Sequence, residues 1–307
     1  MKRAVLIFST LFILVYCTAC TQDTDNGDSQ AIRIAYLPIT HSVVMMMMAA
    51  EKDEDAPYTI ELVPFSTWPD VVDALRTGRV DGASILFEVA LQARGYDDSL
   101  TMTSLSHRDG NVIVVDNTVQ SYHDLIGRTV AIPHRLSPQY TLLQIVLERE
   151  EIDPESLNII EISPAEMPFT MAGGAISAFI VAEPFGSIAE SAGVGRIFET
   201  SDQIFYNSVC CVMVLRDIDH NPSQRDWFIS RFEQIAEAAH RRDEHVLQVF
   251  RNHSRVSDDI IRSSFDHINF DNLSIDYHEY NNITDIILRH SVLDKVPHFA
   301  DFVLPDR

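Results

Sequence analysis

The chain has 307 residues and a formal net charge of -22 at pH 7, with 23 lysine and arginine residues against 45 aspartate and glutamate residues. A surface this acidic repels phosphate backbones, so a nucleic-acid-binding role is excluded. Because 46% of the residues are hydrophobic, the chain can build one large or two ordinary domains with real cores.

The first residues have the pattern of an export signal. Lys2 and Arg3 precede an apolar run from Ala4 to Tyr16, and small residues then lead to Cys20. The apolar run is well short of the ~20 residues that a membrane-spanning helix needs. We therefore expect this segment to direct export and to take no part in the fold.

The residues around Cys20 resemble a bacterial lipobox. This resemblance implies that residues 1–20 are a lipoprotein signal peptide and that Cys20 becomes the acylated N-terminus. Plain secretion, with Cys20 incidental, is the alternative. Residues 21–30 are polar and rich in aspartate, as a solvated tether should be. We expect an extracytoplasmic protein that is held at the membrane through Cys20.

From Ile32 onward, short β-rich runs alternate with helical stretches, which is typical of a mostly parallel sheet flanked by helices. The first series predicts strands over residues 32–37, 59–64, 82–87, 101–106 and 111–116. It predicts helices over residues 41–50 and 68–77, and Gly78 stops the second of these.

A second series follows the first. It predicts strands over residues 128–133, 157–162 and 175–182, and helices over residues 138–150, 165–172 and 184–192. A return strand over residues 208–215 comes next, and the chain beyond residue 221 is predicted to be helical with a break at residues 269–276.

The return strand indicates that the second series is inserted into the first. We therefore predict an α/β protein with two lobes, each a mixed sheet flanked by helices. Residues 31–116 and 207–307 would form lobe 1, and residues 117–206 would form lobe 2. Two crossing segments make a hinge, and the ligand cleft should lie between the lobes, where the carboxyl ends of the strands meet.

Four segments carry a family resemblance. They are residues 35–40 (AYLPIT), residues 66–69 (STWP) with 74–83 (ALRTGRVDGA), residues 124–133 (DLIGRTVAIP), and residues 182–185 (AEPF) with 193–196 (GVGR). In this order, and with the lipobox, they resemble the nitrate, sulfonate and bicarbonate-type family of ABC-transporter substrate-binding proteins. The resemblance implies the type II periplasmic-binding-protein fold, capture of a small molecule by lobe closure, and delivery to an ABC permease with a cytoplasmic ATPase.

Candidate ligand-binding residues lie around the start of the helix over residues 138–150. Ser137 and the proline after it form an N-cap pattern, and free N–H groups at such a place bind anions. An ordinary cap is the alternative. Gln139 and Tyr140 lie in the first turn of this helix, and His134 and Arg135 lie in the loop before it. A solvated loop is the alternative for Arg135.

The other predicted lobe offers similar positions. Thr40 and His41 follow the first strand, and Trp68 begins a helix, where it could stack on a ligand or simply pack. Phe87 and Glu88 close the third strand, where the resemblance implies pocket residues.

The remaining candidates lie near the predicted crossings. Glu183 ends a strand and would repel a bare anion, so it implies a ligand with a donor group, a metal ion, or a structural role in the hinge. Asn207 begins the return segment, and Cys210 and Cys211 follow it. As strand neighbours, the two cysteines are expected to be buried thiols on opposite faces, without a disulfide.

The resemblance implies a receptor, not an enzyme, for an oxyanion such as a sulfonate, nitrate or bicarbonate, acting as a monomer. No cofactor is expected, and no metal ligand is assigned. A thiamine pyrimidine precursor is an alternative ligand, since Trp68, Phe87 and Tyr140 could sandwich a ring. An enzyme on the same fold, like the pyrimidine synthases, is a third possibility, against which the export signal argues.

Overall fold

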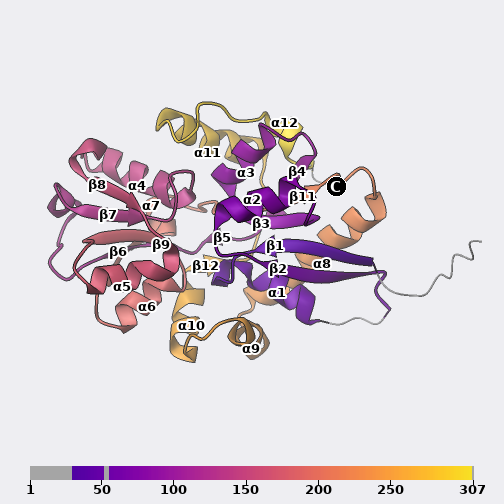
Figure 1. Cartoon of the computed structure of the whole chain (residues 1–307), viewed down its shortest axis with the longest axis horizontal. Coiled ribbons are helices and arrows are strands. Elements are labelled where there is room, and N and C mark those ends of the chain that lie inside the picture. Colours follow the sequence, from indigo (N-terminus) through magenta and orange to yellow (C-terminus); the bar gives the residue numbers. More distant parts are fainter. Residues whose placement is uncertain (1–29, 52–54, 306–307) are drawn as a thin grey trace, which may run out of the picture.

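The computed structural model describes residues 30–51 and 55–305. It contains two five-stranded sheets, which form two lobes side by side along the long axis (Figure 1). The predicted signal peptide, Cys20 and all but the last residue of the tether lie outside the described residues. Within the described part of the chain, no helix combines the length and the apolarity that a membrane span requires.

The sheet of the first lobe is mixed, as predicted. Its strands, in spatial order, are β2 (Tyr58–Pro64), β1 (Gln30–Tyr36), β3 (Gly82–Leu86), β11 (Cys211–Arg216) and β4 (Leu100–Leu105). The return strand β11 pairs antiparallel with both β3 and β4, whereas β1 is parallel to its two neighbours. The chain therefore comes back to the first sheet, between β3 and β4, after it has built the second.

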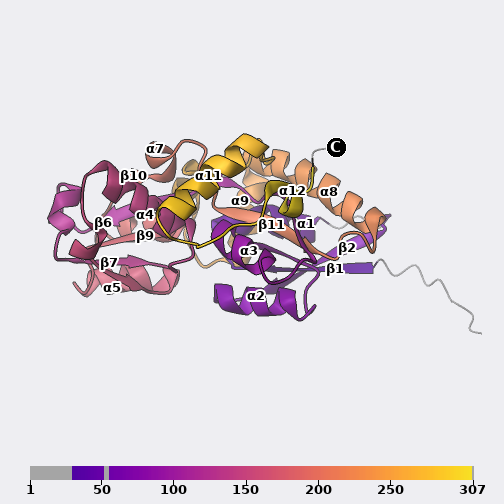
Figure 2. The same cartoon turned by 90° about the horizontal axis from the view of Figure 1, so that it is seen from above.

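Helices cover both faces of the first sheet. They are η1 (Thr40–Ser42), α1 (Val43–Ala50), α2 (Trp68–Arg76), α3 (Phe87–Arg94), α8 (Pro222–His240), α9 (Glu244–His253), α10 (Asp258–Asp266), α11 (Tyr277–Arg289) and α12 (Phe299–Phe302). Figure 2 shows α2 on one side of the sheet and α8 on the other. Helix α1 packs against both α8 and α9, so its run of four methionines is buried.

The second lobe is a three-layer unit. Its sheet has the order β10 (Arg196–Thr200), β6 (Asn111–Val115), β9 (Ala178–Ala182), β7 (Thr129–Ile132) and β8 (Asn158–Glu161). Its helices are η2 (Tyr122–Leu125), α4 (Pro138–Arg149), η3 (Pro154–Ser156), η4 (Pro164–Glu166), α5 (Met167–Ala172), α6 (Phe185–Ser191) and α7 (Ser201–Ile204). Apolar residues of α4 fill one face of the sheet, and those of α5 and α6 fill the other.

The structure corrects the predicted lobe boundary. Strand β6 was assigned to lobe 1, which was predicted to run to residue 116, but it pairs antiparallel with β9 and β10 of the second sheet. The first crossing therefore lies before Asn111, and the return crossing lies between α7 and β11. At the hinge the two crossings meet, since Arg108 and Val209 form an antiparallel bridge.

Helix α3 and strand β10 are the longest elements that were not predicted. Helix α3 begins at Phe87, which was expected to end a strand, and strand β10 lies at the edge of the second sheet. The run over residues 87–94 is short and mostly apolar, and a buried helix cannot be told from a strand by such a pattern. Residues of β10 are only half-buried, as befits an edge strand with a weak apolar pattern.

Candidate functional site

A buried polar cluster lies where the two lobes meet. It consists of Glu88 on α3 of the first lobe, Asn111 on β6, and Gln139 and Thr141 on α4 of the second lobe. Glu88, Asn111 and Gln139 are each about 1% exposed. We call these four residues the interlobe polar cluster. Because they come from both lobes, their meeting depends on how α3 of the first lobe packs against the second lobe.

Two hydrogen bonds hold the interlobe polar cluster. The Thr141 hydroxyl donates to Glu88 Oε1 at 2.6 Å, which joins α4 to α3 across the lobes. Gln139 Nε2 donates to Asn111 Oδ1 at 2.6 Å. The Cys210 thiol lies 3.7 Å from Asn111 Oδ1 and 4.0 Å from Gln139 Nε2, so the cluster surrounds the return crossing.

Three atoms of the interlobe polar cluster are buried without a hydrogen-bond partner. They are Glu88 Oε2, Asn111 Nδ2 and Gln139 Oε1. Leaving such an atom unpaired costs about 1–3 kcal/mol, and folded proteins rarely leave three so close together. A ligand that both donates and accepts hydrogen bonds would satisfy them. This makes the cluster the candidate ligand-binding site.

The Glu88 carboxyl is neutral at pH 7. Burial raises the pKa of Glu88 to about 8, although the Thr141 hydroxyl lowers it in part. Since Thr141 donates to Oε1, the unpartnered Oε2 is the oxygen that is free to carry the proton. A neutral Glu88 therefore offers a hydrogen-bond donor, and it does not repel an anion as a carboxylate would.

Ser137 caps α4, as predicted. Its hydroxyl accepts a bond from the Tyr140 N–H at 3.1 Å and donates to the His134 carbonyl at 2.6 Å. The side chain is thus fully engaged in capping. Its contribution to the site is to hold the first turn of α4, from which Gln139 and Thr141 reach the cluster.

Thr40 and Glu183 make a second connection between the lobes. The Thr40 hydroxyl donates to the Glu183 carbonyl at 2.6 Å. The Glu183 carboxylate accepts bonds from the N–H and the hydroxyl of Ser187, both at 3.0 Å, and lies 3.8 Å from His267 Nε2. Burial raises the pKa of Glu183. These contacts are those of a structural partner in the hinge, one of the three roles that the sequence left open.

Trp68 and His134 face a different space. They line a pocket of about 210 Å³ between the lobes, with Leu37 from the first lobe and Ile162 from the second. None of the residues that line this pocket belongs to the interlobe polar cluster. The structure therefore places these two predicted residues between the lobes, but not beside Glu88 and Gln139.

The three aromatic rings of the alternative pyrimidine site, Trp68, Phe87 and Tyr140, lie against separate neighbours. Phe87 is buried against Tyr280 in an edge-to-face pair with centroids 5.8 Å apart. The Tyr140 ring lies under the Arg135 guanidinium at 5.3 Å, and Trp68 lines the small pocket. Among the described residues, no ring contact joins Trp68, Phe87 and Tyr140.

Asn207 contributes its backbone to the hinge. It has φ of 56°, and its carbonyl accepts a bond from Arg108 at 3.2 Å. The Arg108 guanidinium is 2% exposed and also bonds to the Asn272 and Ser274 carbonyls and to the Glu279 carboxylate. Arg108 is thus neutralised inside the fold and leaves no free charge for a ligand.

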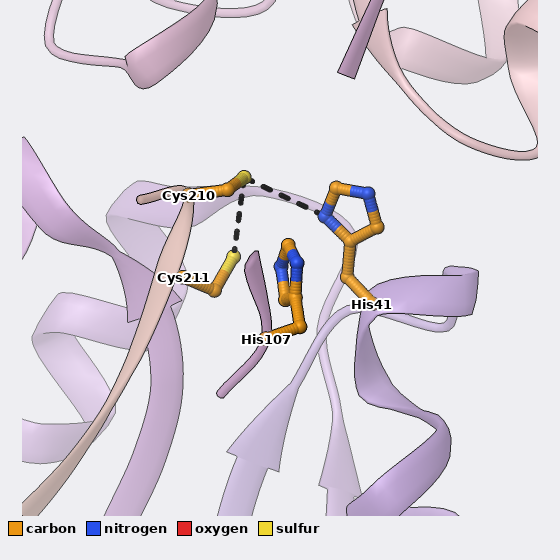
Figure 3. A group of neighbouring side chains, drawn as sticks. All are labelled: His41, His107, Cys210 and Cys211. Atoms are coloured by element: carbon orange, nitrogen blue, oxygen red, sulfur yellow. Dashed lines mark hydrogen bonds between the residues drawn. The ribbon is translucent and has the colours of Figure 1, made fainter. Parts of the chain in front are cut away.

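Four further residues that the sequence did not group together meet beside the cluster. His41, His107, Cys210 and Cys211 are all buried, and their side chains converge (Figure 3). The expectation that the two cysteines point to opposite faces was wrong, since their sulfurs lie 3.9 Å apart. Strand β11 begins at Cys211, so Cys210 precedes it and does not follow the strand alternation. Both are free thiols, as predicted.

The pKa values of the two thiols in this group shift in opposite directions. Burial alone would raise the pKa of Cys210, but the hydrogen bond from Cys211 and the His41 ring lower it well below the ordinary value. Burial raises the pKa of Cys211. Burial also lowers the pKa of His107 and keeps its imidazole neutral. Of the two thiols, Cys210 therefore gives up its proton more readily.

Two α/β lobes joined by two crossings define the periplasmic-binding-protein fold, and solved structures confirm this fold. A structure described as the ligand-binding component of an ABC-type import system from Staphylococcus aureus, with zinc bound, is 31% identical, with a TM-score of 0.83; the match covers 90% of this chain and 97% of that one. The aliphatic sulphonate-binding protein SsuA from Escherichia coli is 16% identical, with a TM-score of 0.74 and coverage of 91% and 94%.

Sequence comparison assigns the family. The model of the NMT1-like family matches residues 25–248, so the chain belongs to that family.

The bicarbonate transport ATP-binding protein CmpC of Synechocystis is 25% identical over 226 residues, which are 65% of this chain and 32% of that protein. The nitrate import ATP-binding protein NrtC of Synechocystis is 26% identical over 195 residues, which are 56% of this chain and 29% of that protein. The chain thus spans about a third of the length of the curated relatives it matches. The predicted kinship with nitrate and sulfonate-type binding proteins of ABC importers is confirmed.

Proposed function

We propose that the chain is the extracytoplasmic solute-binding component of an ABC importer. It captures a small oxyanion between its lobes and passes it unaltered to a permease that works with a cytoplasmic ATPase. Family membership and the S. aureus relative support the transport role, and the CmpC and NrtC matches support a bicarbonate-like or nitrate-like ligand. The lipobox resemblance supports a lipid anchor on Cys20.

One observation carries the proposal: three buried polar atoms of the interlobe polar cluster, which both lobes contribute to, have no hydrogen-bond partner. Glu88 Oε2 and Asn111 Nδ2 are donors, and Gln139 Oε1 is an acceptor. The two donors suit the oxygens of an oxyanion, and no charged side chain is needed to bind it. The acceptor suits a ligand that also carries a proton to donate.

The presence of two donors and one acceptor narrows the range of ligands that fit the site. Bicarbonate has a hydroxyl, and an aminosulfonate has an ammonium group, so either can donate to Gln139 Oε1. Nitrate has no proton and would leave that acceptor unpaired, at a cost of about 1–3 kcal/mol. The site therefore favours an oxyanion that carries a donor group over one that does not.

The test is calorimetric titration of the full chain with bicarbonate, taurine, nitrate and a hydroxymethylpyrimidine in separate experiments. Bicarbonate or taurine should bind more tightly than nitrate, by about tenfold or more for one unpaired acceptor. A ligand at 100 times its dissociation constant should also stabilise the fold by about 2.7 kcal/mol in a thermal-unfolding experiment. Binding of the pyrimidine alone, or turnover of any of these compounds, would refute the proposal.

A further inference from the structure

Three separate segments bring the Cys–His group together at the hinge. His41 comes from η1, His107 from the first crossing, Cys210 from the end of the return crossing and Cys211 from the start of β11. All four side chains are at most 1% exposed. One ligand atom from each residue lies within 4.8 Å of those of the other three (Figure 3). Four soft or borderline donors thus surround a single point.

Two of the donor–donor distances match tetrahedral coordination, and the others lie within 4.8 Å. With Zn–S near 2.3 Å and Zn–N near 2.0–2.1 Å, two sulfurs on one ion lie about 3.8 Å apart, and a sulfur and a nitrogen lie about 3.6 Å apart. The two sulfurs here are 3.9 Å apart, and Cys210 Sγ is 3.5 Å from His41 Nδ1. No side chain would have to move far to ligate an ion.

The histidines are already oriented as ligands. His41 Nε2 lies 2.9 Å from the Gly110 carbonyl, to which it donates, so Nδ1 presents its lone pair to the sulfurs. His107 Nδ1 lies 3.3 Å from the Arg108 carbonyl, and its Nε2 is buried without a partner. Backbone carbonyls that hold the second ring nitrogen are the usual outer shell of a metal-binding histidine.

Gly110 makes this arrangement possible. Its φ of 84° is a conformation that favours glycine, and a Cβ there would lie 2.6 Å from His41 Nε2. A larger residue would therefore push the His41 ring away from the carbonyl that orients it.

The charges also balance. A divalent ion with two thiolates and two neutral imidazoles carries no net charge, so its burial avoids the cost of an isolated charge. Thiolates suit zinc-like ions and do not suit magnesium or calcium. A tetrahedral set of two sulfurs and two nitrogens is typical of a structural zinc site.

We propose that His41, His107, Cys210 and Cys211 bind a divalent transition-metal ion of the zinc class at the hinge between the lobes. The ion links η1 to both crossing segments and so stabilises the hinge on which closure depends. The site adjoins the interlobe polar cluster, since Cys210 Sγ lies 3.7 Å from Asn111 Oδ1, but its four ligands are other residues than Glu88, Asn111 and Gln139.

The test uses the full chain, kept reduced, stripped with a chelator and titrated with Co²⁺ alone. One Co²⁺ should bind per chain, with thiolate-to-cobalt charge-transfer bands and the intense visible bands of a tetrahedral site. Zn²⁺ should displace it and raise the unfolding temperature. Absence of these bands in the reduced wild-type protein would overturn the proposal, whatever the variants do.

Variants localise the site. Cys210→Ser and His107→Gln should each lower Zn²⁺ affinity by more than the ~10- to 100-fold that outer-shell substitutions cost. His240→Asn, on the exposed end of α8, is the matched control and should bind as the wild type does. Full binding by a folded Cys210→Ser/Cys211→Ser double variant would contradict the assignment. Calorimetry with bicarbonate on the metal-free protein separates failure of this site from failure of the transport proposal.

Discussion

The pH dependence of Glu88 is a quantitative test of the interlobe polar cluster. Burial raises the pKa of Glu88 to about 8 in the folded protein, against an ordinary value of 4.5. Between these two values the folded chain holds a proton that the unfolded chain has lost. The stability that Glu88 contributes is therefore fully present below pH 4.5 and is lost as pH rises through about 8.

The size of the effect follows from the shift. Between pH 4.5 and about 8, each pH unit lowers the free energy of unfolding by about 1.4 kcal/mol. The total is on the order of 5 kcal/mol for a fully buried carboxyl. Glu88→Gln keeps a donor and an acceptor but cannot ionise. The variant should therefore be less pH-dependent, and its stability relative to the wild type should rise steadily from pH 5 to pH 8.

The assay is urea unfolding of the metal-free protein at pH 5, 6, 7 and 8. Glu233→Gln, on the exposed face of α8, is the matched control and should track the wild type at every pH. A difference between Glu88→Gln and the wild type that stays constant across this range would refute the assignment of a neutral Glu88. The proposed hydrogen-bond donor for an oxyanion would then be lost as well.

Three further outcomes are expected. Thr141→Val removes the hydrogen bond to Glu88 that joins the two lobes, and it should weaken ligand binding by about 5- to 150-fold in calorimetry. Unchanged affinity would show that ligand binding does not need this hydrogen bond. Glu199 accepts two bonds from Arg149 and has a lowered pKa, so Glu199→Gln should cost about 1–3 kcal/mol in urea unfolding at pH 7, and this difference should shrink as pH falls below 4. Arg108→Met leaves buried hinge acceptors unpaired and should cost about 3–5 kcal/mol in the same assay, whereas a loss below 1 kcal/mol would contradict its role in the hinge.

The sequence by itself determined the local elements and the family. The stop at Gly78, the cap at Ser137 and the alternation of apolar runs depend on residues within one or two turns of each other. Such signals are local, and they were enough to predict two α/β lobes joined by a hinge. Buried helices such as α3 and edge strands such as β10 carry weaker local patterns and were missed.

Only the tertiary structure decided which sheet took β6 and which side chains meet in the site. Strand pairing depends on partners far along the chain, so the placement of β6 beside β9 could not be read locally. Glu88 and Thr141 are 53 residues apart, and His41 and Cys210 are 169 apart. No spacing rule covers such distances. The fold alone brings these groups within bonding range, because the packing of the two lobes places them there.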